Sequence, residues 1–106
     1  MAYEGIMDEE CVQLCDAVNK LSGIETIASC CGHGKHSFCV WFVVKHLKYL
    51  PRLLYYLDVC HCGFSGWQTT VTTDCAMSPV HFCIRGPVGA YDQAVRIAEL
   101  IEQEAE

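Results

Sequence analysis

The most reactive side chains of this chain gather in one short stretch, residues 29–36. It carries two thiols, two imidazoles, one ammonium group and two glycines within eight residues, in the order Ser29, Cys30, Cys31, Gly32, His33, Gly34, Lys35 and His36. Glycines tolerate positive φ and let backbone N–H groups approach a ligand closely. A plain hairpin turn needs only two or three residues of the Asn-Gly type. The stretch can therefore line a ligand site, hold a metal ion, activate a thiol or form a structural turn.

The spacing of the possible metal ligands argues against a zinc site. Structural zinc sites use pairs of ligands separated by two to five residues. Cys30 and Cys31 are adjacent and do not readily bind one ion, so only His33 and His36 have a useful spacing. A second cluster, Cys60-His61-Cys62, lies at the end of an expected helix and is a weak candidate. We predict neither a metal nor a cofactor.

Thiol catalysis remains the alternative. A cysteine beside a histidine can become a nucleophilic thiolate, and Cys30 or Cys31 has His33 and His36 close by in sequence. Asp74 is the candidate for an orienting carboxylate. A small Cys/His or metal-dependent enzyme acting on a nucleotide or RNA is thus the second hypothesis, and whether the chain is an enzyme stays open, with binding preferred.

Binding without chemistry fits the residue types better. The loop offers backbone donors and cationic or hydrogen-bonding side chains for phosphate, and aromatic rings elsewhere can stack on a base. Beyond the loop, the expected ligand-binding residues are Trp41, His46, Ser78, His81 and Arg85.

Composition sets limits on the partners. The chain has 106 residues and a net charge of −6, with no basic run, which disfavours non-specific binding to nucleic acid. No apolar run is long enough to span a membrane, so no membrane partner is expected. The first residues lack the pattern of a signal peptide, and the nine cysteines are odd in number, so we expect a cytoplasmic protein without a disulfide framework. Four cysteines at apolar positions act as small hydrophobes: Cys11, Cys15, Cys39 and Cys83.

Periodicity predicts a single α+β domain over residues 1–106, with the order α-β-β-α-β-β-α. The expected elements are a helix from Asp8 to Leu21, strands at Ile24–Ser29 and Phe38–Val44, a helix at His46–Cys62, strands at Trp67–Thr73 and Val80–Arg85, and a helix at Tyr91–Gln103. In the second helix, the predicted buried stripe is Leu50, Leu53, Leu54 and Leu57. The strand Phe38–Val44 is apolar on both faces, which predicts a central position.

An internal repeat organises these elements. Ser22-Gly23-Ile24-Glu25-Thr26 matches Ser65-Gly66-Trp67-Gln68-Thr69, and Ser37-Phe38-Cys39-Val40 matches His81-Phe82-Cys83-Ile84. Two β-β-α units, over approximately 22–62 and 65–105, would form one four-stranded antiparallel sheet with helices packed on it. The stretch that begins at Cys30 would then correspond to the loop Asp74–Pro79.

The repeat also predicts which residues share a face. If the second strands of the two units are neighbours, the following residues lie on one face of the sheet: Trp41, His81, Cys83 and Arg85. That face is apolar enough to need cover from the first helix or from a partner subunit. A pocket at such a boundary is a natural ligand site, so we expect a homo-oligomer.

Three segments resemble a known family. Ala28-Ser29-Cys30-Cys31-Gly32-His33, Trp41-Phe42-Val43-Val44-Lys45-His46 and Pro79-Val80-His81-Phe82-Cys83-Ile84 are similar, in order, to motifs of the wybutosine-synthesis methyltransferases that act on transfer RNA. The resemblance implies a fold and a ligand cleft around Ser29, Cys30, Gly32, Trp41 and His46. Cys31 stands where that family has serine and His33 where it has arginine, and methyl transfer is not carried over.

The Cys-Cys-Gly-His-Gly stretch also resembles small proteins of bacteriophages and prophages. By analogy with phage proteins that sequester nucleotide immune signals, the chain is expected to bind a small nucleotide-like molecule of the cyclic ADP-ribose type without turnover.

Overall fold

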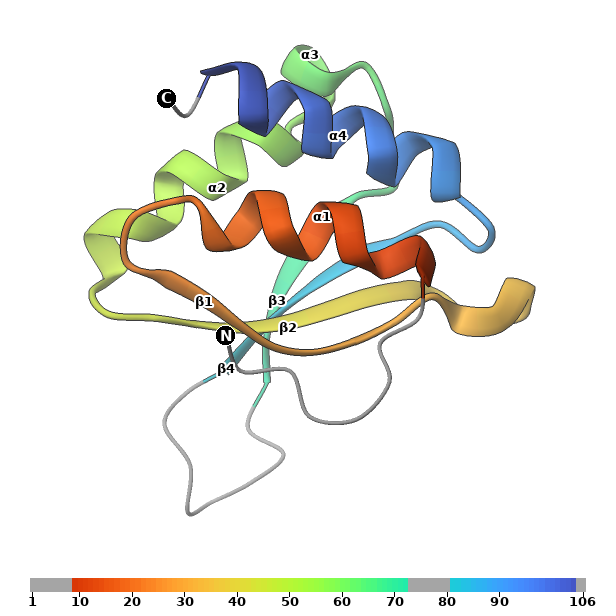
Figure 1. Ribbon diagram of the computed structural model, residues 1–106, viewed down its shortest axis with the longest axis horizontal. Coiled ribbons are helices and arrows are strands. Elements are labelled where there is room, and N and C mark those ends of the chain that lie inside the picture. The colour runs from red at the N-terminus through yellow and green to blue at the C-terminus, as the bar shows by residue number, and fades with distance from the viewer. Residues whose placement is uncertain (1–8, 73–80, 105–106) are drawn as a thin grey trace.

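The structure, a computed structural model, describes residues 9–72 and 81–104. It contains a four-stranded antiparallel sheet of order β1-β2-β4-β3 with the helices packed on it (Figure 1). The strands are β1 (Ile24–Cys30), β2 (Phe38–Val44), β3 (Gln68–Thr72) and β4 (His81–Gly86). The helices are α1 (Glu9–Asn19), α2 (Leu50–Leu57), α3 (Val59–Cys62) and α4 (Tyr91–Glu104), with 3₁₀ turns η1 (Gly32–Gly34) and η2 (Leu47–Tyr49). The predicted α+β class and antiparallel sheet are confirmed.

The pairing of β2 with β4 forms the centre of the sheet. Alternate residues of β2 point toward the helices and are fully buried: Phe38, Val40 and Phe42. Phe42 lies opposite Phe82 of β4, and the two rings stack with centroids 5.5 Å apart. Because Phe38–Val44 has strands on both sides, its predicted central position is confirmed.

The helices lie on one side of this sheet (Figure 1), where α1 packs against α4 over β1, β2 and β4. Buried side chains from both helices complete the core: Leu14 and Val18 from α1, Ile97 and Ile101 from α4. In the described part of the chain, no helix covers the opposite face of the sheet.

The sheet face away from the helices carries the residues that the repeat predicted to lie together on one face. Trp41 of β2 pairs with Cys83 of β4, and Cys39 pairs with Arg85, so their side chains point away from the core cluster. The expectation that the first helix covers this face is wrong, because the apolar stripe of α1 is already buried against α4 and the other face. Cover by a partner subunit stays a prediction.

A buried hydrogen-bonded pair fixes α1 to the first strand. Asn19 Nδ2 donates to Thr26 Oγ1 at 2.8 Å, and the Thr26 backbone N–H donates to Asn19 Oδ1 at 2.8 Å. Thr26 is 1% exposed and lies beside a β-bulge between Thr26 and Ala28. The pair satisfies polar groups that would be costly to bury unpaired, and it sets how α1 leads into the sheet.

The single helix predicted over His46–Cys62 is wrong. The segment divides into η2, α2 and α3, with Asp58 in an extended conformation (φ −67°, ψ 130°) between the two helices. Asp58 Oδ1 accepts a hydrogen bond from the Cys60 backbone N–H at 2.9 Å, so its side chain starts a new helix rather than continuing the old one. In α2 the buried residues are Leu53, Tyr56 and Leu57, whereas Leu54 is 40% exposed instead of buried.

The other element boundaries differ from the predicted ones by a few residues at most. The loop Asp74–Pro79 lies outside the described residues. The strand order is symmetric about β2 and β4, which is the arrangement that two β-β-α units would give; the repeat itself stays a prediction. None of the described helices has the length and apolar character needed to cross a membrane.

The stacked pair at the sheet centre gives a test of the fold. Phe42→Ala removes a fully buried ring and is expected to lower the free energy of unfolding by about 3–5 kcal/mol, measured by urea denaturation. Val71→Ala, at a 63% exposed position of an edge strand, is the control and should change it by about 0.5 kcal/mol or less. Equal effects would contradict the central role of this pair.

Candidate functional site

The reactive stretch forms a compact turn between β1 and β2. Gly32 is buried with φ +81°, and a Cβ there would lie 2.9 Å from the Ser37 carbonyl oxygen. His33 adopts a left-handed conformation (φ 53°), and the backbone N–H groups of Lys35 and His36 both donate to the Gly32 carbonyl at 3.0 Å. The amides of Lys35 and His36 therefore stabilise the turn itself, and are not aimed outward at a ligand.

The thiols of the turn are also engaged locally. The Gly32 N–H donates to Cys30 Sγ at 3.4 Å, and the His33 N–H donates to Cys31 Sγ at 3.3 Å. Cys31 Sγ lies 3.7 Å from His33 Nδ1, which is the thiol–imidazole contact that a catalytic pair would need. Cys31 is, however, only 3% exposed and belongs to the core cluster, so a substrate has little access to its sulfur.

A row of polar and sulfur groups continues from the turn across the sheet face that no described helix covers. Cys30 of β1 lies directly opposite Cys39 of β2, and Cys39 lies opposite Arg85 of β4. The Arg85 guanidinium donates to Cys39 Sγ at 3.5 Å. Sequence reasoning treated Cys39 as a small hydrophobe, whereas the structure gives it a cationic neighbour.

Cys83 follows on the same face of β4 and is fully buried. Burial raises the pKa of its thiol from the ordinary 9.0 to about 12, and the neighbouring Cys39 adds to this rise. The thiol of Cys83 therefore stays protonated at neutral pH.

The remaining predicted ligand residues do not gather around the turn. Trp41 is half-buried in the middle of the sheet face that no described helix covers, and Ser29, although next to the turn in sequence, lies on the other face of β1, opposite Val40. His81 and His46 lie near the far end of the sheet, because β4 begins at His81 and β2 ends two residues before His46. Ser78 lies outside the described residues. The predicted set is thus divided between the two ends of the sheet.

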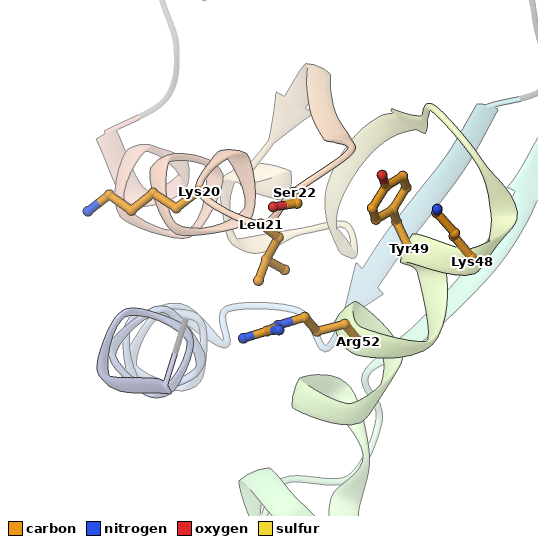
Figure 2. A pocket seen from close by; sticks show the side chains of 6 residues that line it. All are labelled: Lys20, Leu21, Ser22, Lys48, Tyr49 and Arg52. Carbon is orange, nitrogen blue, oxygen red and sulfur yellow. The ribbon is translucent and has the colours of Figure 1, made fainter. Parts of the chain in front are cut away.

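A cavity lies at the end of the sheet remote from the turn. Its volume is about 290 Å³, and it lies between the end of α1 and the start of α2 (Figure 2). The lining residues are Lys20, Leu21, Ser22, Lys48, Tyr49 and Arg52. We call this cavity the basic pocket.

Two close contacts hold the walls of the basic pocket. The Lys45 N–H donates to the Gly23 carbonyl at 2.8 Å, which joins the two strand ends. The ring of Tyr49 packs on Gly23 so closely that a Cβ there would lie 2.2 Å from the ring. Figure 2 shows Leu21 and Ser22 on one wall, facing Tyr49 and Arg52 on the other.

The charges around the basic pocket are partly compensated by the end of α4. Lys20 Nζ lies 2.8 Å from Glu102 Oε1, and the Arg52 guanidinium donates to the Glu104 carbonyl at 3.5 Å. Lys48 Nζ lies 5.3 Å from the centre of the Tyr49 ring, a cation–π contact. Because Lys20 is paired with Glu102, the positive charge left at the cavity is that of Lys48 and Arg52.

Of the predicted site residues, His46 lies closest in sequence to the basic pocket. Its Nδ1 accepts a hydrogen bond from the Lys48 N–H at 3.1 Å, so it starts the turn that presents Lys48 and Tyr49. Sequence reasoning missed the pocket itself. One signal for the pocket was available in the sequence: Lys48 and Arg52 are four residues apart at the start of a helix. Nothing in the sequence indicated that Lys20 lies beside them.

Comparisons with known proteins give no relative: no family model, no curated protein and no solved structure matches this chain. The resemblance to the wybutosine-synthesis family stays a prediction. Among residues 9–72 and 81–104, no three His, Cys, Asp or Glu side chains are grouped so that they could hold a metal ion.

The raised pKa of Cys83 predicts a loss of stability at alkaline pH. Above about pH 9 the unfolded chain releases this proton while the folded protein keeps it, so the stability that the neutral thiol contributes is complete below pH 9 and is lost as the pH rises toward 12. Between pH 9 and pH 10 the wild type should lose about 1 kcal/mol more than Cys83→Ala. Urea denaturation at both pH values measures the difference, and equal losses would contradict it.

Proposed function

We propose that this protein binds a small phosphate-bearing ligand, of nucleotide-like chemistry, in the basic pocket and does not convert it. The observation that carries the proposal is the concentration of positive charge. Three of the seven Lys and Arg residues of a chain with net charge −6 line one cavity. Such a cluster attracts a small anion even though the overall charge repels a polyanion.

The donors around the pocket suit a phosphate group. Arg52 can offer paired N–H donors, Lys48 a point charge, and Ser22 a hydroxyl. The pocket also lies beside the start of α2, which continues directly from η2 and has no acidic residue in its first turn. The positive end of the helix dipole adds to the attraction for an anion.

The resting contacts of the cations are weak enough to be exchanged. Lys20 and Glu102 form their ion pair with side chains that are 59% and 42% exposed. Exposed ion pairs contribute about 0–1 kcal/mol, so competition from the acidic end of α4 costs a ligand little. The 3.5 Å contact of Arg52 is likewise long for a hydrogen bond.

The size and lining of the pocket limit what it does. A volume of about 290 Å³ is near the lower end for small-molecule sites, which favours a mononucleotide-sized ligand or smaller. The residues that line it include no thiol, imidazole or carboxylate, and the side chains present that can serve in acid–base catalysis are lysines and a tyrosine. This lining supports binding without turnover over the enzymatic alternative.

The narrower expectations stay predictions. They are a phage origin, sequestration of an immune signal of the cyclic ADP-ribose type, and assembly of several copies. Tyr49 already contacts Gly23 and Lys48 with its ring, which leaves phosphate recognition better supported than stacking on a base.

The proposal predicts that positive charge in the pocket sets affinity for phosphate ligands. Lys48→Ala and Arg52→Ala should each weaken binding of AMP about tenfold, the effect of losing one hydrogen bond to a charged group. Isothermal titration measures the affinities, with adenosine as the ligand that lacks phosphate. Arg96→Ala is the matched control, because Arg96 is an exposed cation of α4 paired with Glu99 at 3.5 Å and does not line the pocket.

Two results would contradict the proposed function. One is equal binding of AMP by the wild type, the two pocket variants and the control, which would place the ligand elsewhere. The other is recovery of chemically altered AMP after the complex is denatured, which would show turnover.

A further inference from the structure

We propose that Cys30 and Cys39 form a thiol–disulfide exchange site whose substrate class is a low-molecular-weight disulfide such as oxidised glutathione. Cys30 is the last residue of β1 and Cys39 the second residue of β2, so the pair flanks the turn between these strands. The basic pocket lies at the other end of the sheet, so this inference does not depend on the proposed function.

The strand register places the two cysteines at the Cα separation that a disulfide requires. Cys30 and Cys39 are direct cross-strand partners, and such partners have Cα atoms about 4.5–5.5 Å apart with side chains on the same face. A disulfide requires a Cα separation of about 4.4–6.8 Å. The pair can therefore close without a change of strand register.

The third cysteine on this face is less well placed. Cys83 lies opposite Trp41, which makes it a diagonal neighbour of Cys39, and its thiol shares a side-chain hydrogen bond with Cys39. Diagonal positions have Cα atoms about 7–8 Å apart, beyond the range of an unstrained disulfide. Burial also raises the pKa of the Cys83 thiol to about 12, so the reactive thiolate is scarce there.

The two cysteines differ in solvent accessibility. The more accessible thiol is the one that a disulfide in solution can reach first. Cys30 is half-buried and can be reached by a small disulfide, whereas Cys39 is 6% exposed. The Arg85 guanidinium contacts Cys39 Sγ at 3.5 Å and supplies a positive charge beside the sulfur that becomes negative during exchange. Cys30 is thus the entry thiol, Cys39 the resolving thiol, and Arg85 a positioning residue.

The reaction then proceeds in two balanced steps. The Cys30 thiolate, after losing its proton to water, attacks one sulfur of oxidised glutathione, forming a Cys30–glutathione mixed disulfide and releasing one glutathione thiolate. The Cys39 thiolate, also deprotonated, attacks the Cys30 sulfur, forming the Cys30–Cys39 bond and releasing the second glutathione thiolate. Both leaving thiolates take a proton from water, so two protein thiols are oxidised and one glutathione disulfide is reduced.

The closed disulfide would join the two ends of the Cys30–Cys39 segment. Gly32 and His33 at its centre already adopt positive φ angles. The bond would restrict this turn further and make its conformation depend on the thiol–disulfide balance around the protein.

Incubation of the folded, full-length protein with oxidised glutathione tests this site. After acid quenching, intact mass and peptide mapping should show the loss of two hydrogens and a Cys30–Cys39 link. Cys39→Ser should instead accumulate one glutathionyl group on Cys30, and Cys30→Ser should leave Cys39 unmodified. Cys60, an exposed thiol on α3 whose neighbour Cys62 does not face it, is the internal control and should keep any glutathionyl group it acquires.

The role of Arg85 has its own measurement. Arg85→Gln should slow the release of the second glutathione about tenfold while leaving adduct formation on Cys30 unchanged, and Arg85→Lys should restore most of that rate. A purely structural role would not separate the two steps, so equal slowing of both would overturn the assignment of Arg85.

Peptide mapping of the wild type is enough to overturn the proposed exchange site. The contradicting result is a Cys30 that keeps its glutathionyl group or forms a link to another cysteine. This readout needs no variant to fold. Titration of AMP into the reduced protein does not depend on the peptide map. Failure of the exchange experiment would therefore not contradict ligand binding in the basic pocket.

Discussion

The antiparallel pairing of β2 with β4 is the constraint on which the rest of the structure depends. It stacks Phe42 on Phe82 and joins two hairpins into one sheet, whose helix-facing side is then wide enough to bury α1 and α4 together. The same pairing also determines which side chains lie on the sheet face away from the helices. Since side chains alternate along a strand, burying Phe38, Val40 and Phe42 in the core forces Cys39 and Trp41 onto the opposite face, beside Arg85 and Cys83.

This geometry separates the chemistry of the chain into two regions. Strand β2 has seven residues and is roughly 20 Å long, so the turn at its start and the basic pocket beyond its end cannot act on one small ligand. The proposed thiol exchange lies at the turn end, where Cys30, Cys39 and Arg85 lie in one row. The proposed anion binding lies at the other end, where Lys48 and Arg52 line a cavity.

The sequence was sufficient for most of the fold because the strands carry local signals. The continuous apolar run Phe38–Val44 gave the limits and the central position of β2, and the repeat suggested that Trp41, His81, Cys83 and Arg85 share a face. The helix break at Asp58 was missed because the apolar pattern continues through it, while the capping hydrogen bond to Cys60 depends on a single side chain. The basic pocket was missed for a stronger reason. Lys20 is distant in sequence from Lys48, and although the pairing of β1 with β2 brings their segments together, the packing of Tyr49 on Gly23 that shapes the cavity has no sequence signature.

The three cations of the basic pocket do not carry equal weight as evidence for a ligand. Lys20 and Arg52 contact Glu102 and the Glu104 carbonyl at the end of α4, where cations stabilise a helix C-terminus regardless of any ligand. Lys48 has no such role in its described contacts, since its ammonium group lies over the Tyr49 ring rather than beside a carboxylate. A purely structural cluster would need Lys20 and Arg52 but not Lys48. The position of Lys48 in η2, on the wall of the cavity, is therefore the feature that an anion-binding role explains and that contacts with the end of α4 do not.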